Sequence, residues 1–176
     1  IGDSRKPEMQ KTMNLKIKFR ESFRPFAPSI LEEKAADYFD ASEFNPYMLM
    51  VSQIRDEFKT GNKNASGLGS INEKRSSLPA ITHVDYSARV QSVSEVSNSR
   101  YYSLLSAFYK KTGCPVLVNT SFNVRGEPIV LSPYDAYTCF MRTGMDYLIL
   151  GNFILRKDNQ PVYEDLIDWR NDIPLD

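Results

Sequence analysis

Alternating apolar and polar residues predict two strands, each with one buried face and one polar face. In the first, the apolar side chains Leu15, Ile17 and Phe19 alternate with Lys16, Lys18 and Arg20. In the second, Val84, Tyr86, Ala88 and Val90 alternate with His83, Asp85, Ser87, Arg89 and Gln91. The first strand would hold Lys18 and Arg20 together on its polar face.

Other apolar runs predict further strands at 48–54, 116–118 and 147–155, the last interrupted by Gly151. Helical spacing predicts helices at 7–14 and 30–39, a third around 101–108 that ends at Gly113, and a fourth from 133 to Gly144. Ser132, Pro133 and Asp135 are typical of the N-cap, the first turn and the N3 position of that last helix.

Strands and helices alternate along the chain without internal repeats, so the predicted fold class is α/β or α+β. We expect one domain over residues 1–176. Residues 59–77 are rich in Gly, Asn, Ser and Lys and have almost no large apolar residues. This composition predicts a mobile surface insertion rather than a domain boundary.

The composition narrows the class of protein. The 176 residues carry 22 Lys+Arg and 22 Asp+Glu, and 41% are hydrophobic, which is typical of a globular domain with a core. No apolar run approaches the roughly 18 residues of a membrane span, and the balanced charge disfavours a basic nucleic-acid module.

Locally, residues 1–24 hold seven Lys/Arg against three acids, and residues 157–176 hold two against six. Such blocks are typical of solvated faces or of docking between chain ends.

The two cysteines, Cys114 and Cys139, lie in apolar elements without metal-ligand spacing, and the chain has a single histidine. We therefore predict no metal-ligating residues and a disulfide-free, cytoplasmic protein. The first residue is Ile1, and no signal-peptide pattern follows it. We expect the chain to be a fragment of a longer protein.

Three polar clusters are candidates for chemistry, and each follows an extended segment. They are Lys18, Arg20 and Arg24; His83, Asp85, Ser87 and Arg89; and Asn119, Ser121 and Asn123. If these segments are neighbours, cations and neutral donors converge on one surface, as a phosphate-rich ligand requires. Taken singly, each cluster also fits a solvated sheet face, a cap or a turn. Neither common glycine-rich phosphate loop is present in the sequence. The polar clusters therefore predict an anion site and do not identify the anion.

Several long motifs resemble one family. Residues 19–31 read FRESFRPFAPSIL, residues 83–93 read HVDYSARVQSV, and residues 115–130 read PVLVNTSFNVRGEPIV. Together with DSRKPEMQ at 3–10 and GMDYLILGNF at 144–153, they resemble the C-terminal region of the NodU/CmcH-type O-carbamoyltransferases.

The resemblance implies a YrdC/Sua5-like fold, an open twisted mixed sheet with flanking helices and a basic concave face. It implies that this domain forms carbamoyl adenylate from carbamoyl phosphate and ATP, with Mg²⁺ accompanying the ATP. The expected partners are an N-terminal Kae1-like domain of the same protein and a small-molecule hydroxyl acceptor, to which that domain transfers the carbamoyl group. Neither a membrane nor a nucleic acid is expected as a partner.

The resemblance also implies roles for individual residues. The K-x-R and S-x-N marks of the family fall on Lys18 with Arg20 and on Ser121 with Asn123. We expect catalytic roles for Lys18, Arg24, Arg89 and Ser121, substrate binding by Arg20, Asn119 and Asn123, and nucleotide binding by His83, Asp85 and Thr120. Arg20 and Asn119 fit a loop-supporting role as well.

Two other interpretations remain open at this point. One is a non-catalytic nucleotide- or RNA-binding module on the same fold, because a basic face alone binds polyanions. The other is a structural platform that docks the N-terminal domain and shields a reactive intermediate.

Overall fold

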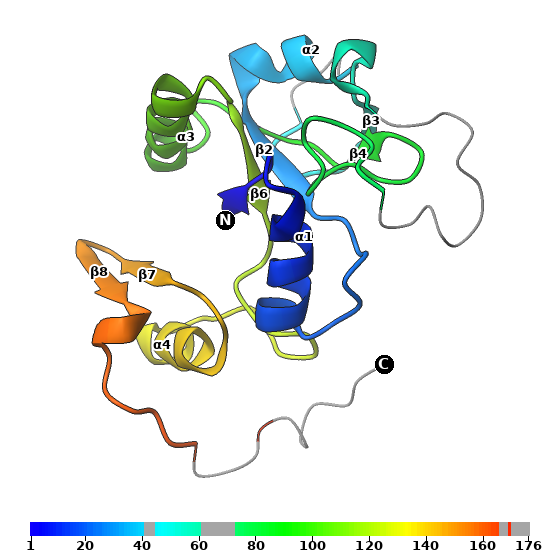
Figure 1. Cartoon of the computed structure of the whole chain (residues 1–176). Helices are drawn as coiled ribbons and strands as arrows, with labels where there is room; N and C mark the ends of the chain where they lie inside the picture. The colour runs from blue at the N-terminus through cyan, green and yellow to red at the C-terminus, as the bar shows by residue number, and fades with distance from the viewer. Residues whose placement is uncertain (41–44, 61–72, 166–168, 170–176) are drawn as a thin grey trace. The chain divides into compact units, whose positions relative to one another are not determined.

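The computed structural model describes residues 1–40, 45–60, 73–165 and 169. These residues form two compact units (Figure 1). Unit 1 comprises Ile1–Gln10 and Pro25–Thr120, and unit 2 comprises Lys11–Arg24 and the chain from Ser121 onward. Most of the predicted insertion at 59–77 lies outside the described residues.

Unit 1 is built on a four-stranded mixed sheet in the order β1-β6-β2-β5. The strands are β1 (Gly2–Asp3), β6 (Val116–Asn119), β2 (Ala27–Leu31) and β5 (Gln91–Val93). Strand β6 is antiparallel to both β1 and β2, whereas β2 and β5 are parallel. The predicted α+β class with an open mixed sheet is confirmed.

Helix α3 (Ser99–Thr112) packs against β2 and β6. Its N-cap Asn98 accepts a hydrogen bond from the Tyr101 main chain, and Gly113 ends it with a φ of 72°. Leu105 of α3 joins Leu31, Val93 and Leu117 of the sheet in one buried cluster. Both the helix and its glycine stop are confirmed.

Three predictions for unit 1 are wrong in part. The predicted helix at 30–39 is strand β2 followed by a 3-10 turn (Glu32–Lys34) and the short α2 (Ala35–Tyr38). The alternation at 83–91 is a turn with Tyr86 at φ 64°, then the two-residue β4 (Ser87–Ala88), and then β5. Strand β4 pairs with β3 (Ser52–Gln53). Of the strand predicted at 48–54, β3 and a single bridge from Ile54 to Phe39 form. A second 3-10 turn, Asp56–Phe58, follows β3.

The strand predicted at 15–20 is wrong, because helix α1 (Pro7–Met13) continues there as a π-helical turn, Asn14–Lys18. Phe19 ends this turn in the left-handed region, with φ 50° and ψ 53°. The extra residue in a π turn rotates Lys18 inward, so that only 4% of Lys18 is exposed whereas Leu15 is 46% exposed. Lys18 is therefore buried instead of lying on a polar strand face.

The rest of unit 2 is helix α4 (Pro133–Arg142) with the hairpin β7 (Tyr147–Leu150) and β8 (Phe153–Arg156). Figure 1 shows the hairpin beside α4. Ser132 and Asp135 form the predicted capping box at the start of α4. The strand predicted at 147–155 is two strands, because Gly151 turns the chain with a φ of 60°. A 3-10 turn (Lys157–Asn159) follows β8.

Ala136 and Phe140 of α4 pack on Leu148 of the hairpin to form the core of this part of unit 2. Among the described residues, no helix has the length and hydrophobicity needed to cross a membrane.

Candidate anion site

A buried lysine in unit 2 is surrounded by neutral oxygen atoms. Lys18 Nζ lies 2.6 Å from the main-chain oxygen of Ser121 and 2.9 Å from that of Asn123. It also lies 3.1 Å from Ser121 Oγ and 2.7 Å from Asn123 Oδ1. An ammonium group has three protons, so these four acceptors share them. Lys18, Ser121 and Asn123 therefore form one hydrogen-bonded cluster, which we call the Lys18 site.

The loop that follows β6 aims these oxygens at the lysine. Asn123 Nδ2 donates to the main-chain oxygen of Glu127 at 2.7 Å, which leaves Oδ1 of the same amide for Lys18. Ser121 Oγ donates to this Oδ1 at 2.5 Å. Gly126, with a φ of 82°, provides the turn that brings Glu127 back. Ser121 itself is exposed, so the cluster reaches the surface through its hydroxyl group.

Within the described chain, no carboxylate forms an ion pair with Lys18. Burial, together with the nearby positive charge of Arg20, lowers the pKa of Lys18 from 10.5 to about 8. A buried ammonium without a counter-charge is the group that an anionic ligand would stabilise most. The Lys18 site is therefore suited to binding an anion.

Three arginines extend the positive charge around this lysine. Burial lowers the pKa of Arg20, and the charges of Arg24 and Arg125 lower it further, which shows that these cations lie close together. Glu21 is the acid among them, 3.7 Å from Arg24 and 3.8 Å from Arg125. Its pKa is lowered by a backbone hydrogen bond and by these arginines. Among these five side chains, Lys18 and the three arginines outnumber the single carboxylate of Glu21.

Asn14 is a site residue that the sequence analysis missed. Its side chain is fully buried, and its amide nitrogen donates to the main-chain oxygens of Ser22 at 3.1 Å and Arg24 at 2.7 Å. Its Oδ1 accepts a 2.7 Å hydrogen bond from Arg20 Nε. Asn14 thus fixes the loop that carries Arg20 and Arg24. A polar residue at a helix end gives no signal of this role in the sequence.

The predicted nucleotide-binding residues lie in unit 1. His83 and Asp85 lie in the turn before β4, so the prediction that they share one face of a strand is wrong. The turn is closed by the His83 N–H, which donates to the main-chain oxygen of Ser87 at 2.9 Å. Asp85 Oδ1 accepts from the Ser87 hydroxyl at 2.6 Å, and this bond lowers the pKa of Asp85. Burial lowers the pKa of His83. Arg89 is exposed, and Thr120 directly follows β6.

A polar row crosses the sheet of unit 1 and fixes Asn119. Gln91 Oε1 accepts from Asn119 Nδ2 at 2.6 Å and from Ser29 Oγ at 2.7 Å. Gln91 Nε2 donates to the main-chain oxygen of Pro46 at 3.1 Å. A carbonyl can only accept, so Pro46 fixes the orientation of Gln91, and Gln91 fixes that of Asn119. Within the described residues, no group donates a hydrogen bond to Asn119 Oδ1, so this oxygen is available as an acceptor.

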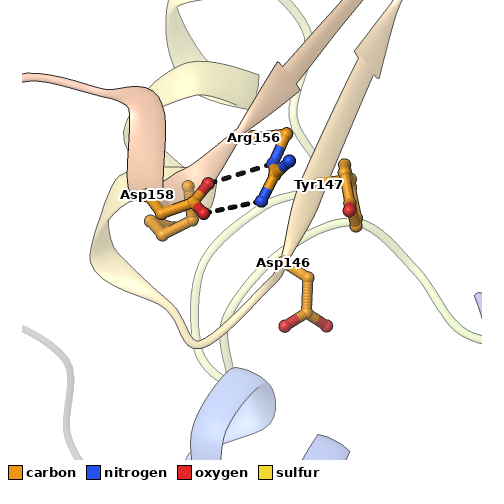
Figure 2. Close-up of a pocket in the computed structure, with 5 residues that line it drawn as sticks. Asp146, Tyr147, Arg156 and Asp158 are labelled. Carbon is orange, nitrogen blue, oxygen red and sulfur yellow. Dashed lines mark hydrogen bonds and ion pairs between the residues drawn. The ribbon is translucent and has the colours of Figure 1, made fainter.

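A hollow of about 390 Å³ in unit 2 is lined by five residues from the end of the hairpin and the turn after it: Asp146, Tyr147, Arg156, Lys157 and Asp158. In Figure 2, Arg156 and Asp158 face each other through two hydrogen bonds, of 3.1 and 2.7 Å. Asp158 thus neutralises Arg156. None of the predicted site residues lines this hollow.

These observations define an α+β protein with a candidate anion site on a buried lysine. Residues 1–157 match the family model described as the carbamoyltransferase C-terminus, and the chain belongs to this family. The family prediction made from the motifs is confirmed.

The relatives of the chain are longer proteins. It is 56% identical over 180 residues to the uncharacterized protein sll1178 of Synechocystis sp., covering 100% of this chain and 29% of that protein. It is 41% identical to the nodulation protein NolO of Bradyrhizobium diazoefficiens, covering 89% of this chain and 26% of the relative. It is 39% identical to the nodulation protein U of Rhizobium tropici, with coverages of 69% and 18%. The chain thus spans less than a third of the length of each of these relatives.

Proposed function

We propose that the chain is the carbamoyl-activating domain of an O-carbamoyltransferase, which forms carbamoyl adenylate from carbamoyl phosphate and ATP. The observation that carries this proposal is the buried Lys18 ammonium, held by neutral oxygens and flanked by Arg20 and Arg24. Both substrates are phosphate-rich, and membership of the carbamoyltransferase C-terminal family supports carbamoyl transfer as the overall reaction. The greater length of the relatives supports a second, Kae1-like domain that transfers the carbamoyl group to a hydroxyl acceptor.

The proposed reaction has two steps. Water cleaves carbamoyl phosphate to carbamate and inorganic phosphate. A carbamate oxygen then attacks the α-phosphorus of ATP, which forms the carbamoyl adenylate linkage and breaks the bond to the departing pyrophosphate. The second step brings the carbamate anion against the negatively charged phosphates of ATP, so fixed cations lower its barrier. Lys18, whose protons its four oxygen partners share, contributes its positive charge to phosphate binding, whereas Arg24 gives a bidentate contact.

The neutral residues of the Lys18 site have separate roles in this proposal. Ser121 Oγ, exposed and bonded to both Lys18 and Asn123, contacts the carbamoyl or phosphate group. Arg20 supports the loop through Asn14. For unit 1 we keep the roles that the family resemblance implies, with His83, Asp85 and Thr120 toward the nucleotide and Arg89 and Asn119 toward the transferring groups.

In the described part of the chain, no group of three or more His, Cys, Asp or Glu residues is placed to hold an ion. We therefore assign no side chain to Mg²⁺, which the phosphates of ATP would hold. Both cysteines are buried free thiols, and this supports a cytoplasmic location.

Pyrophosphate release tests the proposal. The full chain is incubated with ATP and carbamoyl phosphate, and pyrophosphate is measured with and without carbamoyl phosphate. The proposal predicts release that requires both substrates and is lost in Lys18→Met. Binding of ATP without any pyrophosphate release would instead support the non-catalytic nucleotide-binding module.

A further inference from the structure

The chain continues beyond residue 157, where the match to the family model ends. Trp169 in this C-terminal segment is only 9% exposed, and it packs in a cluster with Val124 and Cys139. Phe19 and Phe122 lie against the same cluster. Trp169 therefore packs in the same cluster as Phe19, which follows Lys18 in the sequence, and as Phe122 and Val124 of the loop after β6.

The aromatic rings of Trp169 and Phe19 pack edge to face. Their ring centroids are 5.4 Å apart and the planes are inclined at 60°. Phe19 lies between Lys18 and Arg20 and has a positive φ, which a non-glycine side chain adopts only where its surroundings hold it. Trp169 is one of the groups that hold Phe19 in this conformation.

A second contact leads from Trp169 to the other side of the Lys18 site. The Arg142 guanidinium lies 5.4 Å from the centre of the Trp169 ring and bonds Asp165 of the same segment at 2.6 Å. Arg142 also pairs with the Glu127 carboxylate at 3.4 Å. The main-chain oxygen of Glu127 accepts the hydrogen bond that orients Asn123. A closed series of contacts thus joins both sides of the site.

We infer that Trp169 is a positioning residue for the Lys18 site, and that its contacts with Phe19 and Arg142 set the affinity of the site for its anion. This inference rests on the proposed function. Loss of the indole ring removes a partner from both Phe19 and Arg142, so the π turn and the loop after β6 are both released. Trp169 contacts Phe19 and Arg142, so we infer that its effect on the Lys18 site passes through these two neighbours.

The test measures binding of inorganic pyrophosphate by calorimetry to the full chain and five variants, at a temperature where thermal unfolding shows each to be folded. Trp169→Ala is expected to weaken binding roughly five- to tenfold, and Trp169→Phe less than threefold because it keeps an aromatic ring. Arg142→Lys keeps the charge but loses the paired bonds to Asp165, and is expected to weaken binding about threefold. If Trp169→Ala does not fold, the Arg142→Lys variant tests the inference in its place.

Tyr163→Ala is the matched control. Tyr163 packs on Tyr137 and hydrogen-bonds to Thr138 of α4, and within the described residues it forms no hydrogen bond with Arg142 or Glu127. It should leave the affinity within about twofold of the parent. Trp169→Ala should also move the loss of binding at alkaline pH to higher pH, because a more hydrated Lys18 holds its proton longer.

The two claims fail in different ways. A parent chain that binds no pyrophosphate would overturn the proposed function and this inference with it. A parent that binds, loses binding in Lys18→Met, and keeps the same affinity and pH dependence in Trp169→Ala and Arg142→Lys would overturn the inference alone.

Discussion

The ammonium nitrogen of Lys18 lies 2.6 Å from the main-chain oxygen of Ser121, although 103 positions separate the two residues. The contact joins the end of a π turn to the loop after β6 and leaves a buried positive charge among neutral oxygens. Four of the five predictions below test the consequences of this arrangement.

Replacing Lys18 by Met keeps the length and apolar stem of the side chain and removes its charge. We expect binding of pyrophosphate to weaken at least tenfold, since a hydrogen bond to a charged group contributes about 1.5–3 kcal/mol. Calorimetric titration measures the effect. Lys11→Met, at an exposed position of α1, is the matched control and should bind as the parent does.

The stability of the protein should depend on pH through Lys18. Its pKa of about 8 in the folded chain lies below the ordinary 10.5, so the unfolded chain binds more protons between these values. Stability relative to Lys18→Met should therefore rise from pH 8 to 10.5, while the full cost of burying the charge is present below pH 8. Denaturant unfolding of both proteins across this range measures the difference, and parallel curves would contradict it.

Asn14→Asp should be strongly destabilising despite the similar shape of the two side chains. The change turns a donor into an acceptor that faces the main-chain oxygens of Ser22 and Arg24. Each buried group left without its hydrogen bond costs about 1–3 kcal/mol. Urea unfolding should show a loss of that size or more. Unchanged stability would show that Asn14 does not hold the loop.

Gly144 is required by a close approach of two segments in unit 2. Its N–H donates to the main-chain oxygen of Lys16 at 2.7 Å, and a Cβ at this position would lie 2.9 Å from the Cβ of Lys16. Gly144→Ala should cost about 1–3 kcal/mol and weaken anion binding, because it displaces the π turn that carries Lys18. Gly151→Ala has open space around it and should cost only about 1–2 kcal/mol of backbone strain, with binding unchanged.

The fixed carbonyl of Asn119 should recognise an amino group. Under the proposed function, the chain should prefer carbamoyl phosphate to acetyl phosphate, which has a methyl group in place of the amino group, by about five- to tenfold. Asn119→Ala should lose this preference, and Gln91→Met should reduce it by freeing the Asn119 amide. Competition binding measures the ratio. An equal affinity of the parent for both compounds would contradict the assignment.

Local signals in the sequence were sufficient for several elements. The Ser132 capping box, the Gly113 stop and the apolar run of β6 each act within a few residues, so their patterns are legible without the rest of the chain. The grouping of Lys18 with Ser121 and Asn123 came from spacing and from the family motifs. Their roles stay predictions.

Other features depend on tertiary contacts that leave no local pattern. The alternation at 15–20 reads as a strand, but a π turn fits the same residues once Lys18 bonds to a loop 103 residues away. Likewise, Tyr86 adopts a positive φ in a segment whose alternation predicts a strand. The roles of Asn14 and Trp169 arise from partners distant in sequence, so neither is legible from its own neighbours.

Calorimetric titration of the full chain with ATP and with carbamoyl phosphate, in parallel with Lys18→Met, tests the central claim most directly. The account predicts that the parent binds both ligands and that the folded variant loses at least tenfold in affinity for them. A folded Lys18→Met variant that binds both ligands as the parent does, or a folded parent that binds neither, would contradict it.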